Sequence, residues 1–217
     1  DYLYSSQHIK VLNGVLNMNN FNGERLKKAR IYREMTIFEL AQKMNCERQV
    51  ISMYENNKLK PEKNIIKQIA KELYFPVKFF LEKENDIIKG SSYFRALLTT
   101  NKKYRKKQIQ RMEFLAQIYF FLQDYIEFPK LDLPNCFYKT PEEAALLLRE
   151  AWGLGLKPID NIIYEVEQHG IIVTGFPTSI DYIDTFSQMI DIEGKTMYLI
   201  GYSNNNTSTS RLHFDIA

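Results

Sequence analysis

The sequence predicts a mainly α-helical chain in two parts, a bundle of five helices over residues 21–82 and an α+β part over residues 111–217. Apolar residues recur at helical spacing in closely spaced segments up to residue 81. After Gly170 the period changes to short apolar runs typical of strands. Charge divides the chain too: residues 1–110 carry 22 Lys+Arg against 11 Asp+Glu, a net of +11, and residues 111–217 carry 7 against 15, a net of −8. Such asymmetry indicates a basic module that meets a polyanion, unless the charges are only solvated surface.

Composition excludes several classes of protein. The chain has 217 residues, 45% hydrophobic and 25% charged, which argues against disorder and against a collagen-like repeat. Its most apolar stretch, residues 114–122, is far shorter than the roughly 20 residues that cross a bilayer. Cys46 and Cys136 stand too far apart to form a disulfide framework. We therefore expect a cytoplasmic protein without a membrane partner.

The five expected helices follow one another closely. The first covers residues 23–33, and Thr36 caps a second helix with Leu40 and Ala41 facing inward. Asn45-Cys46 makes a short break before a third helix. After Lys60-Pro61, a fourth helix has its apolar residues at i, i+3, i+4 and i+7, and Pro76 opens a last short helix that ends near Leu81.

The rest of the chain begins with a basic linker and helix start over residues 83–110, with Lys89-Gly90-Ser91-Ser92 at its centre. A long helix then continues through residue 125. Thr140 caps the next helix, and a further one ends at His169-Gly170. A strand follows at residues 171–173. Residues 185–202 read as a hairpin that turns at Glu193-Gly194.

Residues 35–56 fit a helix-turn-helix, because a short helix with Ala41 inward can brace a second helix through Ile51. Leu40-Ala41, Ile51-Ser52, Tyr54-Glu55 and Lys58 with Lys60-Pro61 resemble the XRE family of phage-repressor-like DNA-binding domains over about residues 22–82. The resemblance implies double-stranded operator DNA as the partner, bound by a homodimer. A glycine is usual in this family where Asn57 stands, although asparagine tolerates the left-handed backbone of that turn.

Two groups of DNA contacts follow from this resemblance. Base readers open the recognition helix, because arginine favours guanine, glutamine favours adenine and apolar side chains touch thymine methyls; these are Arg48, Gln49, Val50 and Met53. Side chains that hold phosphates fix the register without reading sequence; these are Thr36, Asn56, Lys58 and Lys60. The basic stretch from Lys102 to Lys107 either contacts DNA as well or only begins a solvated helix.

Residues 111–217 show no catalytic or metal-binding constellation of their own, because the three histidines have no ligand spacing with each other or with the cysteines. Their order of motifs nevertheless resembles the front of the ImmA/IrrE family of zinc metallopeptidases: Arg149 to Gly155, Gly170 to Val173, and Arg211 with Phe214 and Ala217. In that family the last segment leads into His-Glu-x-x-His, which binds zinc and supplies a general base. The resemblance implies a truncated zincin-like domain, with zinc and a repressor substrate belonging to the intact parent and no cofactor in residues 1–217.

Neither end of the sequence is expected to coincide with the boundary of a domain. Met18 stands where such domains usually begin, so residues 1–20 are expected to be leader or flanking sequence outside the fold. At the other end, a helix that opens at Ser210 is cut after Ala217.

Three functions remain open from the sequence. The first is a sequence-specific DNA-binding transcription regulator. The second is a zinc metallopeptidase that cleaves a repressor and that the DNA-binding part only localises. The third is a protein-interaction module, such as an antitoxin or anti-repressor, that uses the aromatic segment from Tyr119 to Tyr125.

Overall fold

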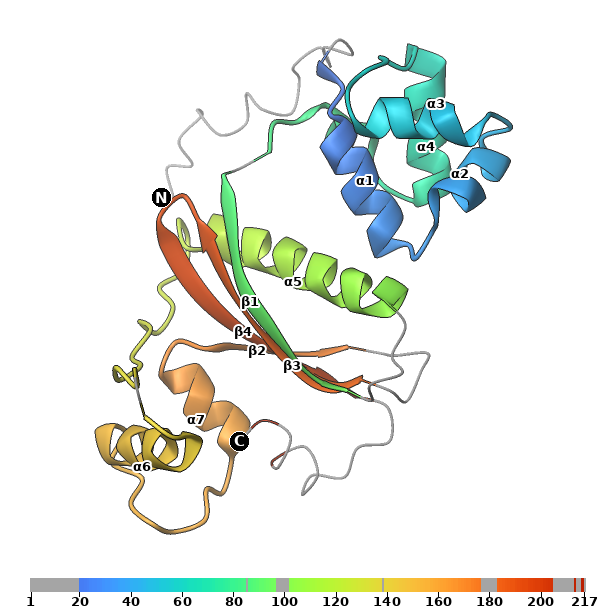
Figure 1. Cartoon of the computed structure of the whole chain (residues 1–217). Coiled ribbons are helices and arrows are strands. Elements are labelled where there is room, and N and C mark those ends of the chain that lie inside the picture. The colour runs from blue at the N-terminus through green and yellow to red at the C-terminus, as the bar shows by residue number, and fades with distance from the viewer. Residues whose placement is uncertain are drawn as a thin grey trace, which may run out of the picture. The chain divides into compact units, whose positions relative to one another are not determined.

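The structure is a computed structural model that describes residues 20–84, 86–96, 102–137, 139–176 and 183–204, together with residues 213 and 216. It separates into two compact units, Asp1–Glu84 and Asn85–Ala217, which are described separately below (Figure 1). Nearly all of the predicted flanking segment 1–20 lies outside the described residues, and so does most of the predicted closing helix.

Among its described residues, the first unit contains the α-helices α1 (Gly23–Tyr32), α2 (Ile37–Lys43), α3 (Arg48–Glu55) and α4 (Lys63–Leu73), followed by the 3-10 helix η3 (Val77–Leu81). Their inward side chains form one apolar core, in which Leu26, Leu40, Ile51 and Ile69 are completely buried. The predicted apolar faces of the four α-helices are therefore confirmed.

In the described part of the second unit there are three helices, α5 (Lys102–Leu122), α6 (Pro141–Ala151) and α7 (Ile162–Gln168), and four strands, β1 (Ile87–Ala96), β2 (Ile172–Phe176), β3 (Ile183–Ile192) and β4 (Lys195–Ser203). The strands form one mixed sheet in the order β1-β3-β4-β2. Strand β2 runs parallel to β4, whereas the β1–β3 and β3–β4 pairs are antiparallel.

The predicted fold class is wrong. The described residues combine α-helices with a four-stranded mixed sheet, and do not form a mainly α chain with a five-helix domain and a zincin-like front part. The fifth helix is a 3-10 turn, in which the Phe79 amide donates to the Pro76 carbonyl at 3.0 Å. Five residues after a proline make a short segment, and 3-10 geometry is common in such pieces.

Strand β1 accounts for much of the difference. It occupies residues 87–96, inside the segment predicted as a linker, and pairs with β3 from Ile87 opposite Ile192 to Ala96 opposite Ile183. Glycine and serine at its centre have low strand propensity, but strand propensity depends strongly on the neighbouring strand. At Gly90 a Cβ would lie 2.5 Å from the methyl group of Met189, so the glycine allows close packing at this point.

Helices cover the sheet on both faces (Figure 1). Because side chains alternate along a strand, Met197 and Leu199 of β4 join the core beneath α5, whereas Ile200 packs with the apolar residues of α7. The predicted hairpin is confirmed: β3 and β4 are joined by Glu193 and Gly194, which both have positive φ, at 53° and 83°. Two positive φ angles match the twist of the flanking strands.

The Gln188 side chain is a buried amide that lies between α5 and the sheet. Gln188 of β3 is 2% exposed, and neither polar atom of its amide has a hydrogen-bond partner in the described part of the chain. Burying an unpaired amide costs about 1–3 kcal/mol. Gln188→Met is therefore expected to raise the free energy of unfolding of the second unit by about 1 kcal/mol. Urea unfolding followed by the fluorescence of Trp152, the one tryptophan in the sequence, measures this unit.

The matched control for this prediction is Gln168→Met on the exposed end of α7, where the change should stay within about 0.5 kcal/mol. A loss of stability in Gln188→Met would contradict the assignment and show that the amide has a stabilising partner.

Candidate nucleic-acid interface

Helix α2 begins with a reciprocal cap. The Thr36 hydroxyl accepts a hydrogen bond from the Glu39 amide at 3.1 Å, and the Glu39 carboxylate accepts one from the Thr36 amide. This capping box confirms the predicted helix start. Thr36 is exposed, and its hydroxyl hydrogen is not used in the cap. The side chain therefore retains a donor for a phosphate oxygen.

A tight turn links α2 to α3. Asn45 has a φ of 51°, and the amides of Asn45 and Cys46 donate to the carbonyls of Gln42 and Ala41 at 3.1 and 3.0 Å. This pattern closes the last turn of α2 and redirects the chain. Ala41 and Ile51 are buried in the same core, as the sequence predicts.

Helix α3 exposes its first turn and buries its opposite side. Arg48 and Gln49 are exposed, and neither side chain makes a hydrogen bond or an ion pair with another described residue. Val50 and Met53 are half-buried, and Val50 packs against the core. Arg48 and Gln49 therefore have the access that a base reader needs, whereas Val50 presents only part of its side chain.

The other predicted phosphate contacts lie at the end of α3 and just after it. The side-chain amide nitrogen (Nδ2) of Asn56 donates to the Ser52 carbonyl at 2.7 Å, which uses one of the two hydrogens on that nitrogen. Lys58 and Lys60 are exposed in the following loop. Asn57 between them and the helix has a φ of 55°, so the left-handed backbone expected at this position is confirmed.

Two structural contacts that the sequence did not predict hold α3 in place. Arg30 of α1 and Glu55 of α3 form a buried bidentate ion pair, with Nε–Oε1 and Nη2–Oε2 distances of 2.5 and 2.9 Å. The Asn57 side chain accepts from the Gly23 amide at 2.8 Å. Arg30 stands one turn after Leu26 on the inward face of α1, and a charged residue on an apolar face was the signal for a buried partner.

The two structural units meet after residue 84, not at residue 110, so the net charge of each part differs from the one counted in the sequence analysis. Residues 1–84 carry 15 Lys+Arg against 10 Asp+Glu, a net of +5, and residues 85–217 carry 14 against 16, a net of −2. The basic stretch from Lys102 to Lys107 thus begins α5 of the second unit, where Lys102 and Lys106 are exposed. A contact between this stretch and DNA stays a prediction.

The second unit bears on the metallopeptidase and protein-interaction hypotheses. In the described ranges, no cluster of three or more His, Cys, Asp or Glu side chains could hold a metal ion. In the aromatic segment proposed for protein contacts, Tyr119 and Phe120 pack against the core, whereas Phe121 and Tyr125 are exposed. Among the described helices, none is long and apolar enough to cross a bilayer.

Comparison with known proteins adds a distant structural similarity. No protein-family model matches the sequence, and no curated protein matches it. Among solved structures, the chain is similar to PlcR of Bacillus thuringiensis, solved in complex with the peptide PapR7 and DNA, at 17% identity and a TM-score of 0.25. The match covers 68% of this chain and 56% of the PlcR chain, so it spans little more than half of that protein.

Similarity at this level establishes neither function nor family membership. The XRE and ImmA/IrrE resemblances stay hypotheses, and so do the homodimer, the repressor substrate, the zinc of an intact parent and the cytoplasmic location. The metallopeptidase reading also loses its structural basis, because the zincin-like fold class is wrong.

Proposed function

We propose that the first unit binds double-stranded DNA in a sequence-specific manner and that the protein acts as a transcription regulator. One observation supports this most directly: α3 is held from behind by the core and the Arg30–Glu55 pair, while Arg48 and Gln49 on its first turn are exposed and unpaired among the described residues. A recognition helix has to present such side chains to the major groove from a rigid base.

The positions of the predicted phosphate contacts support the same proposal. Thr36 lies at the start of α2, and Asn56, Lys58 and Lys60 lie at the end of α3 and after it, so they flank the helix that carries the base readers. In this arrangement the flanking donors fix the register on the duplex, and Arg48 and Gln49 read guanine and adenine.

Selection from a randomised duplex library with the full chain, followed by binding measurements on the selected site, tests the proposal. Arg48→Ala and Gln49→Ala should each weaken specific binding by about 1–3 kcal/mol and relax preference at one base pair. Lys58→Ala should weaken binding to all sequences about equally and reduce the salt slope by about one.

Arg48→Lys serves as the matched control, because it keeps the charge but loses the bidentate fork. It should reduce preference for the selected base and leave the salt dependence unchanged. Lys27→Ala, an exposed change on α1, controls for charge alone. If no site is selected, or if Arg48→Ala and Gln49→Ala bind a selected site with the parent's affinity and preference, the proposed readers are wrong.

A further inference from the structure

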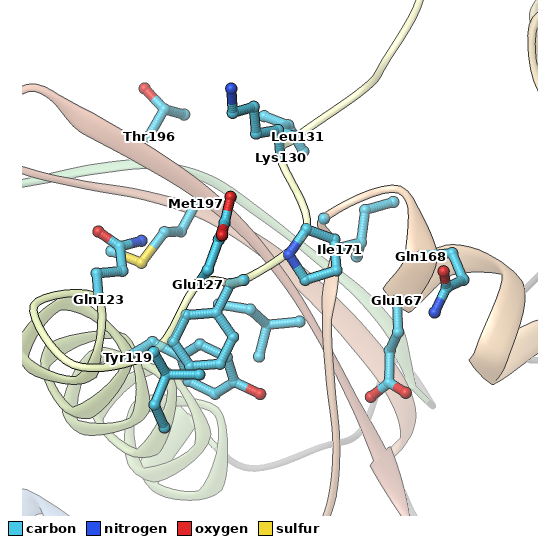
Figure 2. A pocket seen from close by; sticks show the side chains of 15 residues that line it. Tyr119, Gln123, Glu127, Lys130, Leu131, Glu167, Gln168, Ile171, Thr196 and Met197 are labelled. Atoms are coloured by element: carbon cyan, nitrogen blue, oxygen red, sulfur yellow. The ribbon is translucent and has the colours of Figure 1, made fainter.

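A pocket of about 550 Å³ opens in the second unit, built entirely from that unit's own elements (Figure 2). Its walls are the end of α5 with the segment that follows it, the end of α7 with the start of β2, and the start of β4. Pockets of this size hold drug-sized molecules. Nothing in the proposed DNA contact uses it.

The wall of the pocket is fixed by contacts behind it. The Trp152 indole nitrogen donates to the Asp132 carbonyl at 2.9 Å, and the Asp132 amide donates to the His169 carbonyl at 3.1 Å. The His169 ring stacks on Trp152 with centroids 4.1 Å apart, and its Nδ1 lies 3.2 Å from the Asp132 carboxylate. These contacts join residues 130–132 to the end of α7, so the pocket is preformed.

Gly170 allows the close approach behind this wall. It has a φ of 78°, and a Cβ at this position would lie 2.5 Å from the Leu131 nitrogen. The chain after α5 therefore passes directly against the end of α7, which fixes the width of the pocket at this point.

Two aromatic side chains and two carboxylates are among the residues that line the pocket. The rings of Tyr119 and Phe128 lie 4.8 Å apart, and Ile171 and Met197 add apolar surface. Glu127 and Glu167 line the same pocket, and neither forms an ion pair within the described part of the chain. Lys130 is the lining cation, and Figure 2 shows its amine at the upper edge of the view, with Glu167 and Tyr119 lower down.

The electrostatics of the lining favour a positive ligand. The pocket wall partly shields the Glu167 carboxyl from water and raises its pKa. Burial first, and then the nearby Glu167 charge, raise the pKa of the Tyr119 hydroxyl. A cation placed here would relieve the exposed carboxylates and rest against the faces of the aromatic rings.

We propose that this pocket binds a small organic cation, an amine that carries an apolar or aromatic body. Glu167 receives the ammonium group, Glu127 adds negative charge elsewhere in the lining, the rings of Tyr119 and Phe128 contact the body, and Gln123 and Thr196 give further polar contacts. The proposal does not depend on DNA binding by the first unit.

Three probes with the same indole body and different charge test this assignment: tryptamine, tryptophol and indole-3-acetate. The readout is the NMR signal of the Met197 methyl group in the full chain, assigned with Met197→Leu and compared with Met112 in the core beneath α5. Tryptamine should shift Met197 but not Met112, with a dissociation constant near 1 mM, as expected of a fragment. Tryptophol and indole-3-acetate should bind at least about fivefold more weakly.

Variants identify the carboxylates. Glu167→Gln should weaken tryptamine binding about tenfold, because it removes a charge-assisted contact, and Glu127→Gln about twofold to threefold, because it removes only a negative charge from the lining. Glu150→Gln, an exposed carboxylate on α6 outside the pocket, should change nothing. Trp152 fluorescence verifies that each variant is folded. Equal or tighter binding of indole-3-acetate overturns the class of ligand; no Met197 shift with any probe overturns the site; and unchanged affinity in both glutamine variants overturns the role of the carboxylates.

Discussion

Glu55→Ala is expected to destabilise the first unit by about 3–5 kcal/mol, because it leaves the Arg30 guanidinium buried without its counter-ion. Arg30 and Glu55 are 8% and 7% exposed, and the two side chains share a bidentate contact. Arg30 also donates to the Met35 carbonyl at 2.7 Å, so its position supports the segment that leads into α2. Loss of Glu55 therefore weakens the packing of α3 against α1 and the position of the segment before α2.

Hydrogen exchange in the full chain measures this effect on each unit separately, since a chain of two units need not unfold in one step. Protection of the amides of α1 and α3 should fall by about two to four orders of magnitude, as about 3–5 kcal/mol requires. Unfolding monitored by Trp152, which lies in the second unit, should change little.

Two controls separate the buried charge from the lost side chain. Glu24→Ala removes an exposed carboxylate from α1 and should cost less than about 1 kcal/mol. The double variant Arg30→Met with Glu55→Met removes both charges and should recover much of the stability, because apolar replacement of a whole buried pair is often neutral. If Glu55→Ala alone leaves protection intact, the pair does not anchor α3.

The elements that could be predicted from the sequence are those with strong local signals. Thr36 and Thr140 begin helices with capping boxes, and both were predicted as helix caps from the threonine hydroxyl. Gly194 was predicted as a hairpin turn because glycine after a polar residue permits the required positive φ. Local chemistry determines such features, so they can be read without knowledge of the rest of the chain.

The features that were missed depend on distant partners. Strand β1 has glycine and serine at its centre, and its pairing with β3 joins segments about a hundred residues apart, so no local pattern predicts it. The fold class was wrong largely for this reason. The pocket in the second unit was missed likewise: Tyr119 and Glu167 belong to different helices and come together only through the packing around Trp152, His169 and Gly170.

The candidate DNA interface could be predicted from the sequence only in part. Arg48 and Gln49 were selected from a sequence motif, and their exposure on the first turn of α3 agrees with that choice, while the DNA contact itself stays a prediction. The exposure follows from periodicity, because Ile51 and Tyr54 direct the other side of the helix to the core. The supports behind the helix could not be predicted in the same way, since Arg30 and Gly23 act through partners 25 and 34 residues away.

Gly23→Ala is expected to destabilise the first unit by at least about 2 kcal/mol, although alanine is the better helix former. Helix propensity alone favours alanine by up to about 1 kcal/mol. Against this, a Cβ at Gly23 would lie 2.0 Å from the Tyr54 carbonyl oxygen and 2.9 Å from the Glu55 carbonyl carbon. Both atoms belong to the backbone of α3, so no side-chain rotation relieves the overlap. Overpacking costs about 1–3 kcal/mol and occasionally more, and overlap with rigid backbone lies at the upper end of this range, so steric overlap decides the sign.

The same substitution should reduce DNA affinity without touching a proposed base reader. Moving α1 away from α3 breaks the 2.8 Å hydrogen bond between the Gly23 amide and the Asn57 side chain, which holds the turn before Lys58 and Lys60. Asn57→Gly is the matched comparison: it keeps a backbone that permits positive φ but removes the acceptor, so it should lower phosphate binding with only a small loss of stability. A stabilising effect of Gly23→Ala in hydrogen exchange would mean that α1 and α3 do not approach this closely.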